Sequence, residues 1–140
     1  MYLLDTNVIS EFRKTASGKA DKKVIEWSNT IEPAELFLSV VTIQEIEIGT
    51  LLVERRDPTQ GKLLRHWVNN YVLEVFSERL LDVTPQIAIS SAQFCVPNPK
   101  PINDMLIAAT ASVHNMTVVT RNIADFEGTG VKLFNPWGYV

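Results

Sequence analysis

Four acidic side chains stand where a metal-dependent hydrolytic site could assemble, each beside the end of an apolar segment; they are Asp5, Glu45, Asp104 and Asp125. Two carboxylates about 5 Å apart repel each other by roughly 3 kcal/mol at an effective dielectric constant near ~20. A cluster of them therefore protonates, spreads apart or takes up a cation. A hard divalent ion with oxygen ligands, above all Mg²⁺, fits such a cluster.

Polar side chains next to these acids are candidates for orienting them by hydrogen bonding. They are Thr6, Asn7, Ser39, Thr120, Arg121 and Asn122. Arg121 is also a candidate contact for a phosphate group, although an arginine that follows a strand is more often a solvated surface residue. Trp67 and Tyr71 share one helical stripe, which indicates core packing or a subunit contact more than base stacking.

Each acid also has a purely structural interpretation. Asp5 could cap a helix, and Glu45 could complete a capping box with Thr42. Asp104 could favour its own helix through the helix dipole, and Asp125 could be a surface residue. The functional interpretation therefore depends on all four acids meeting at one place.

The expected elements provide that place, because strands alternate with helices along the chain. We predict strands at 2–4, 36–41, 80–83, 117–120 and 131–134, with helices beginning near residues 6, 21, 42, 85 and 102 and a further helix after the break at Asp57-Pro58. This alternation indicates an α/β sandwich with a mainly parallel sheet of four or five strands and helices on both faces. Ligands bind such sheets outside the carboxyl ends of the strands, which is where the four acids fall. We find no linker or repeat, so residues 1–140 are expected to form one domain.

Composition excludes several classes of protein. A net charge of −3, from 13 basic and 16 acidic residues, argues against a DNA coat or a long basic groove. The single Cys95 rules out an internal disulfide and a four-cysteine zinc site. His66 and His114 have no partners at zinc-site spacing. Neither glycine-rich nucleotide-binding motif occurs, and a receiver domain would need a second acid beside Asp5.

The N-terminal residues and the length of the apolar segments predict the cellular location of the protein. The chain begins Met-Tyr-Leu-Leu-Asp, without the basic region of a secretory signal. No apolar run approaches the ~20 residues that span a bilayer. We therefore expect a cytoplasmic protein with no membrane partner.

Five motifs in order resemble PIN-domain toxins of the VapC and FitB type. The opening Leu3 to Ser10 is similar to their first motif, and the segments 39–45 and 104–111 are similar to their second and third. The segment 119–126 resembles the fourth, and Phe134 to Trp137 resembles a FitB-like ending. The resemblance spans almost the whole chain and implies a PIN-like three-layer α/β/α sandwich.

The resemblance implies a Mg²⁺-dependent endoribonuclease, with Mn²⁺ as a substitute ion. Asp5 and Asp104 would be the principal metal ligands, and Glu45 would complete the metal-binding set. FitB-like members have Asp where this chain has Asn122; Asp125 could supply that acid, or Asn122 could ligate through its amide oxygen. The catalytic set we expect is Asp5, Glu45, Asp104 and Asp125, with one strong metal site and one conditional site.

The resemblance also implies partners. The protein would be the toxin of a type II toxin–antitoxin pair, with RNA as substrate, a small DNA-binding antitoxin as partner, and a homodimer or higher oligomer as its assembly. The departure at Asn122 leaves an alternative open, namely a PIN-fold binding or regulatory protein without nuclease activity.

Overall fold

The core of the molecule is a parallel sheet of five strands in the order β3-β2-β1-β4-β5. The computed structural model describes residues 1–140. Its strands are β1 (Tyr2–Leu4), β2 (Leu36–Ser39), β3 (Leu80–Leu81), β4 (Thr117–Val119) and β5 (Leu133–Phe134). Every neighbouring pair is parallel, and in the centre Leu3 pairs with Phe37 on one side and Val118 on the other. The predicted parallel α/β sheet is confirmed.

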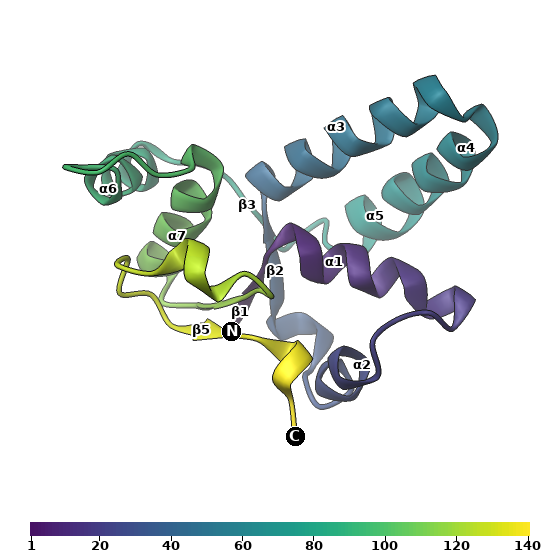
Figure 1. Cartoon of the computed structure of the whole chain (residues 1–140), viewed down its shortest axis with the longest axis horizontal. Helices are drawn as coiled ribbons and strands as arrows, with labels where there is room; N and C mark the ends of the chain where they lie inside the picture. The colour runs from purple at the N-terminus through teal and green to yellow at the C-terminus, as the bar shows by residue number, and fades with distance from the viewer.

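Helices cover both faces of this sheet, as Figure 1 shows. The helical segments are α1 (Thr6–Arg13), α2 (Lys22–Ser28), α3 (Val40–Arg56), α4 (Pro58–Trp67), the π-helical η3 (Val68–Val72), α5 (Leu73–Val75), α6 (Pro85–Phe94) and α7 (Ile102–His114). Short 3-10 turns are η1 (Lys14–Ser17), η2 (Pro33–Glu35), η4 (Ile123–Phe126) and η5 (Pro136–Gly138).

The alternation of side chains along the strands divides the core into two clusters. Leu4 and Val119 belong to a cluster with residues of α1, α2 and the α4–α5 segment. Leu3 and Val118, one residue earlier on the same strands, belong to a second cluster with residues of α7. Consecutive residues therefore face opposite helical layers, which gives the α/β/α sandwich.

The start of α3 differs from the prediction. The second strand ends at Ser39 rather than Val41, and the Ser39 hydroxyl, not that of Thr42, accepts the helix-capping hydrogen bond from the Val41 N–H at 3.0 Å. Ser39 is extended, with φ −84° and ψ 150°, so it is the last residue outside the helix and its hydroxyl can reach the first free N–H groups. The predicted capping box of Thr42 and Glu45 is therefore wrong. Glu45 keeps its carboxylate for other contacts.

Helix α3 is fixed against α4 by close packing and charge. A Cβ on Gly61 would lie 2.6 Å from the Cα of Glu54, so only glycine allows the two backbones to approach this closely. Arg65 on α4 donates to both carboxylate oxygens of Glu47, at 2.7 and 2.9 Å, and also pairs with Glu54 at 3.0 Å. Such forked pairs fix geometry as well as charge, and here they hold the helix that carries Glu45.

None of the helices combines the length and the apolar character that crossing a bilayer would require.

Candidate active site

The carboxyl ends of the central strands collect the polar residues of the site. Asp5 directly follows β1, and Thr120 directly follows β4. The two strands are neighbours, with Leu4 paired to Val119, and the Asp5 N–H donates to the Val119 carbonyl at 2.9 Å. The pairing therefore places the Asp5 and Thr120 side chains together.

Three donors hold the Asp5 carboxylate, which is 6% exposed. Its Oδ1 accepts from the Thr6 N–H at 2.8 Å, and its Oδ2 accepts from the Thr120 hydroxyl at 2.9 Å and the Asn7 side-chain amide at 3.2 Å. The Asn7 Oδ1 in turn accepts from the Arg121 N–H at 3.1 Å. Asp5 is thus more than a helix cap, because residues at opposite ends of the chain orient it.

Glu45 joins this network through Thr6. The Thr6 hydroxyl donates to Glu45 Oε1 at 2.7 Å, which links the first turn of α1 to the second turn of α3. Glu45 is half-buried, and its second oxygen, Oε2, lies outside this hydrogen bond. The contact aims the Glu45 carboxylate toward the same edge of the sheet as Asp5.

The pKa of Asp104 shows that this residue interacts with the other acids of the site. Asp104 lies half-buried in the first turn of α7. Its partial burial raises its pKa to about 6, together with the negative charges of Asp5, Asp125 and Glu45. Burial also raises the pKa of Asp5, against the opposing hydrogen bonds from Thr120, Thr6 and Asn7, and the charge of Asp125 raises it further. Carboxylates from four separate segments therefore act on one another here.

The donor set suits a hard divalent cation, since every side-chain ligand it offers is an oxygen. A cation would remove the repulsion that raises the pKa of Asp104. In their present positions no three acidic, histidine or cysteine side chains converge closely enough to enclose an ion. Mg²⁺ usually keeps several waters and takes only one or two protein carboxylates, so the residues fit it without a closed cage.

Two predicted supporting residues have other roles. Ser39 is fully buried and uses its hydroxyl to cap α3. Asn122 is exposed, and its backbone N–H, rather than its amide, joins the network by donating to the Thr120 hydroxyl at 3.0 Å. Thr42, the rejected cap, is fully buried with its hydroxyl unpartnered.

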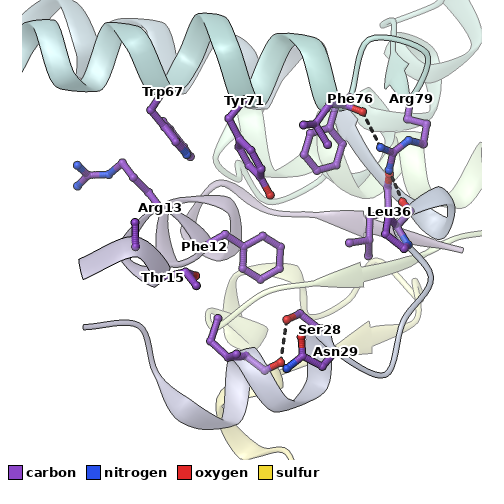
Figure 2. A pocket seen from close by; sticks show the side chains of 14 residues that line it. Phe12, Arg13, Thr15, Ser28, Asn29, Leu36, Trp67, Tyr71, Phe76 and Arg79 are labelled. Carbon is purple, nitrogen blue, oxygen red and sulfur yellow. Dashed lines mark hydrogen bonds between the residues drawn. The ribbon is translucent and has the colours of Figure 1, made fainter. Parts of the chain in front are cut away.

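Two hollows lie against α1, and one of them reaches the site. One, of about 320 Å³, is lined by Thr6 and Glu45 at one end and by Arg13 and Trp67 at the other. The second, of about 570 Å³, shares Arg13 and Trp67 and continues past aromatic side chains to Arg79. Figure 2 shows Trp67 and Tyr71 pointing from their helix toward Phe12 on α1. Through Arg13 and Trp67, which line both, the two hollows form a groove that leads from Glu45 and Thr6 across an apolar surface.

Sequence reasoning missed this groove and the contact between Arg121 and Trp137. Trp67 packs against the core as expected, whereas Tyr71 is exposed. The two rings also stack at a centroid distance of 6.2 Å and line the groove. The guanidinium of Arg121 lies over the ring of Trp137, 5.2 Å from its centroid. No sequence pattern predicts the contact between Arg121 and Trp137, which lie on separate segments of the chain.

Comparison with known proteins agrees with this architecture. The family model described as "PIN domain" matches residues 2–130. The chain belongs to the PIN-domain family. It is 32% identical to Toxin FitB of Neisseria gonorrhoeae, over 98% of this chain and 99% of that protein. It is equally 32% identical to VapC ribonuclease Y4jK of Sinorhizobium fredii, over 98% of both chains.

A solved structure of FitAB bound to the IR36 DNA fragment has the same fold. The TM-score is 0.87 at 30% identity, covering 100% of this chain and 98% of that one. The predicted PIN-like sandwich is thus confirmed. Within this PIN domain, the negative charge of Asp125 raises the pKa of both Asp5 and Asp104.

Proposed function

We propose that this PIN-domain protein is a Mg²⁺-dependent endoribonuclease that acts as the toxin of a toxin–antitoxin pair. The observation that carries the proposal is the position of Asp104 among the carboxylates of Asp5, Glu45 and Asp125. The likeness to a protein named a ribonuclease and to one named a toxin supports it. We propose further that residues 1–140 work as one domain.

Asp5 and Asp104 would hold the ion, with Glu45 completing the set and Mn²⁺ able to replace Mg²⁺. When bound, the ion would neutralise charge on the scissile phosphate and lower the pKa of water at the site. Side chains of the protein position the carboxylates that would act on the substrate. Thr120, Thr6 and Asn7 fix both oxygens of Asp5, so its position is set before substrate arrives. Glu45 Oε2, which Thr6 does not occupy, would accept the proton from the attacking water.

The proposal is tested with purified protein and a circular RNA, which only an endonuclease can cut. We expect cleavage with Mg²⁺ or Mn²⁺ and none in EDTA, with activity restored by excess metal. A circular DNA of the same sequence is the matched substrate control. Cleavage that persists in EDTA, or a folded protein that leaves RNA intact with both metals, would contradict the proposal.

Asp125→Asn is expected to reduce cleavage about 10- to 100-fold, whereas Asn122→Ala changes it less than about threefold. The reason is that Asp125 acts electrostatically on Asp5 and Asp104, while Asn122 contributes its backbone N–H, which alanine retains. Initial rates across a Mg²⁺ titration measure both effects, and Asp125→Asn should need more metal. The reverse ranking would assign the fourth position to Asn122.

An antitoxin is the partner we propose for the groove. Its apolar and aromatic lining, with Arg13 and Arg79 at its sides, suits a peptide segment that carries large apolar and acidic side chains. A segment lying there would extend into the hollow lined by Thr6 and Glu45 and so block the site. The DNA-bound state of the FitAB relative supports an antitoxin that also binds DNA.

Co-expression tests this partner. A candidate antitoxin should relieve growth inhibition by the wild-type protein, and Tyr71→Ala should weaken that relief and the measured affinity about tenfold. Ile89→Ala, an exposed apolar position on α6, is the matched control and should change neither. Equal effects of the two substitutions would remove the groove from the proposal.

The same assays distinguish the alternative of a PIN-fold binding protein without nuclease activity. That alternative rests on the amide at Asn122, where FitB-like members have an acid. It predicts partner binding with no cleavage at any metal concentration. Homodimerisation is likewise a proposal from the resemblance, and light scattering of the purified protein measures it directly.

A further inference from the structure

Arg121 is tied by its backbone to the most buried acid of the site. It follows β4 and Thr120, and its N–H donates to Asn7 Oδ1 at 3.1 Å. The amide nitrogen of the same Asn7 side chain donates to Asp5 Oδ2 at 3.2 Å. The Cα of Arg121 is therefore held at a fixed place relative to Asp5, while its side chain is exposed.

The guanidinium of Arg121 has an aromatic partner and no acidic one. It forms no ion pair within 4.0 Å; the ion pairs of the molecule are Lys14–Glu11, Arg65–Glu47 and Arg65–Glu54. It lies instead over the ring of Trp137, 5.2 Å from the centroid. The guanidinium therefore has no acidic partner, while the backbone of the same residue is tied to the site through Asn7.

Trp137 is itself well fixed. It lies in the turn η5, its N–H donates to Asn135 Oδ1 at 3.0 Å, and its half-buried side chain packs against the core cluster that includes Leu4 and Val119. A guanidinium held by its face to an aromatic ring keeps its N–H groups in the ring plane free. Those groups match a phosphate, which arginine binds with two parallel hydrogen bonds.

We infer that Arg121 binds a phosphate of the RNA substrate beside the scissile bond, and that Trp137 is the positioning residue that holds its guanidinium there. The inference rests on the proposed ribonuclease function and deepens it. A chain with a net charge of −3 and an acidic site repels RNA. A fixed local cation is therefore needed to bind the phosphate backbone of the RNA at the site. We favour an RNA phosphate over a protein carboxylate as the ligand of Arg121. The reason is that the backbone of Arg121 is coupled through Asn7 to Asp5, whereas the apolar groove is where we propose that a protein partner binds.

Steady-state kinetics on a short single-stranded RNA tests the inference. Arg121→Ala should raise KM about tenfold while kcat stays within about twofold, because the contact positions substrate in both ground and transition states. The slope of log KM against log salt should fall by about 0.7, the value for one phosphate contact to a single strand. Arg121→Lys should keep the salt slope but recover only part of KM, since lysine lacks the planar fork. Arg56→Ala, at the end of α3, is the control and should leave both unchanged.

A double-mutant cycle tests the role of Trp137. Trp137→Leu should raise KM several-fold in the wild-type background and leave KM unchanged when Arg121 is already alanine. Trp137→Phe, which keeps an aromatic face, should restore most of the loss. A Trp137→Leu effect of the same size in both backgrounds would show a merely structural role and overturn the positioning claim.

Binding of a fluorescent RNA in EDTA, where no turnover is expected, separates this inference from the proposed function. If the wild-type protein fails to cleave RNA, the proposed function falls, and Arg121→Ala must still weaken RNA binding for the inference to survive. If cleavage is found but Arg121→Ala keeps the wild-type KM and salt slope, the inference falls alone. A loss of antitoxin affinity without any change in RNA binding would assign Arg121 to a protein contact and overturn it.

Discussion

Asp104→Asn is expected to reduce RNA cleavage below about 1% of the wild-type rate and, at the same time, to stabilise the metal-free protein at neutral pH. Cleavage is lost because the amide removes a charge that we propose binds the ion. Stability rises because burial and the charges of Asp5, Asp125 and Glu45 penalise ionised Asp104, which raises its pKa to about 6. The same repulsion that prepares the site for a cation weakens the fold without one.

The sign of the pH dependence follows from that raised pKa. In the unfolded chain an aspartate titrates near pH ~3.9, so the folded state binds the proton more tightly. The stability from the protonated form is fully present below about pH 4 and is lost as pH rises through about 6. Since Asp104 is only half-buried, solvent screening reduces the expected loss to about 1–2 kcal/mol. An asparagine side chain has no proton to lose, so the Asp104→Asn variant should not show this decline.

Urea unfolding in EDTA from about pH 4 to about pH 8 measures the difference. The two proteins should be close in stability near pH ~4 and diverge as pH rises from about 4 to about 6, with the variant more stable; above about pH 6 the gap should stay constant. Glu35→Gln, at an exposed position in η2, controls for the loss of one negative charge and should not reproduce the gap. Saturating Mg²⁺ should narrow or reverse it. Equal pH profiles for wild type and Asp104→Asn would show that the acids do not repel one another as described.

The sequence sufficed to predict the elements whose boundaries have a local cause. The apolar run at Tyr2 to Leu4 stops at a charged residue, and Pro85 suits a first helical turn; both boundaries appear in the structure. The cap of α3 was wrong because Ser39 and Thr42 carry equivalent hydroxyls, and only the end of the strand decides between them. That end depends on pairing across the sheet, where Ser39 pairs with Leu81.

The meeting of the acids could be expected for a similar reason, since parallel strands bring their carboxyl ends to one edge. The contacts between segments could not be expected. Thr6 reaching Glu45, or Arg121 lying over Trp137, depends on where helices settle on the sheet. The spacing of residues in the sequence does not predict how the helices pack on the sheet. The same holds for Asn122, whose backbone rather than its amide meets Thr120.

Asp5→Asn is expected to reduce cleavage as severely as Asp104→Asn, but with the opposite effect on stability. Burial raises the pKa of Asp5, so removing its charge brings some relief. An amide, however, offers one acceptor where the carboxylate offers two. If its oxygen faces Thr120 and Asn7, its nitrogen meets the Thr6 N–H; if it is reversed, its nitrogen meets the donors of Thr120 and Asn7. Either arrangement leaves a buried donor without an acceptor, which costs about 1–3 kcal/mol and exceeds the relief.

The free energy of unfolding in EDTA near neutral pH decides between these effects. We expect Asp5→Asn to be less stable than the wild-type protein by about 1 kcal/mol, while Asp104→Asn is more stable. Thr120→Val, which removes one donor to Asp5 and keeps the side-chain shape, should partly relieve the clash when combined with Asp5→Asn. A stabilised Asp5→Asn protein would mean that the cost of burying the charge outweighs its hydrogen bonds. Asp5 and Asp104 would then be destabilising acids of the same kind, and the proposed difference between an acid fixed by hydrogen bonds and one held chiefly for the ion would not stand.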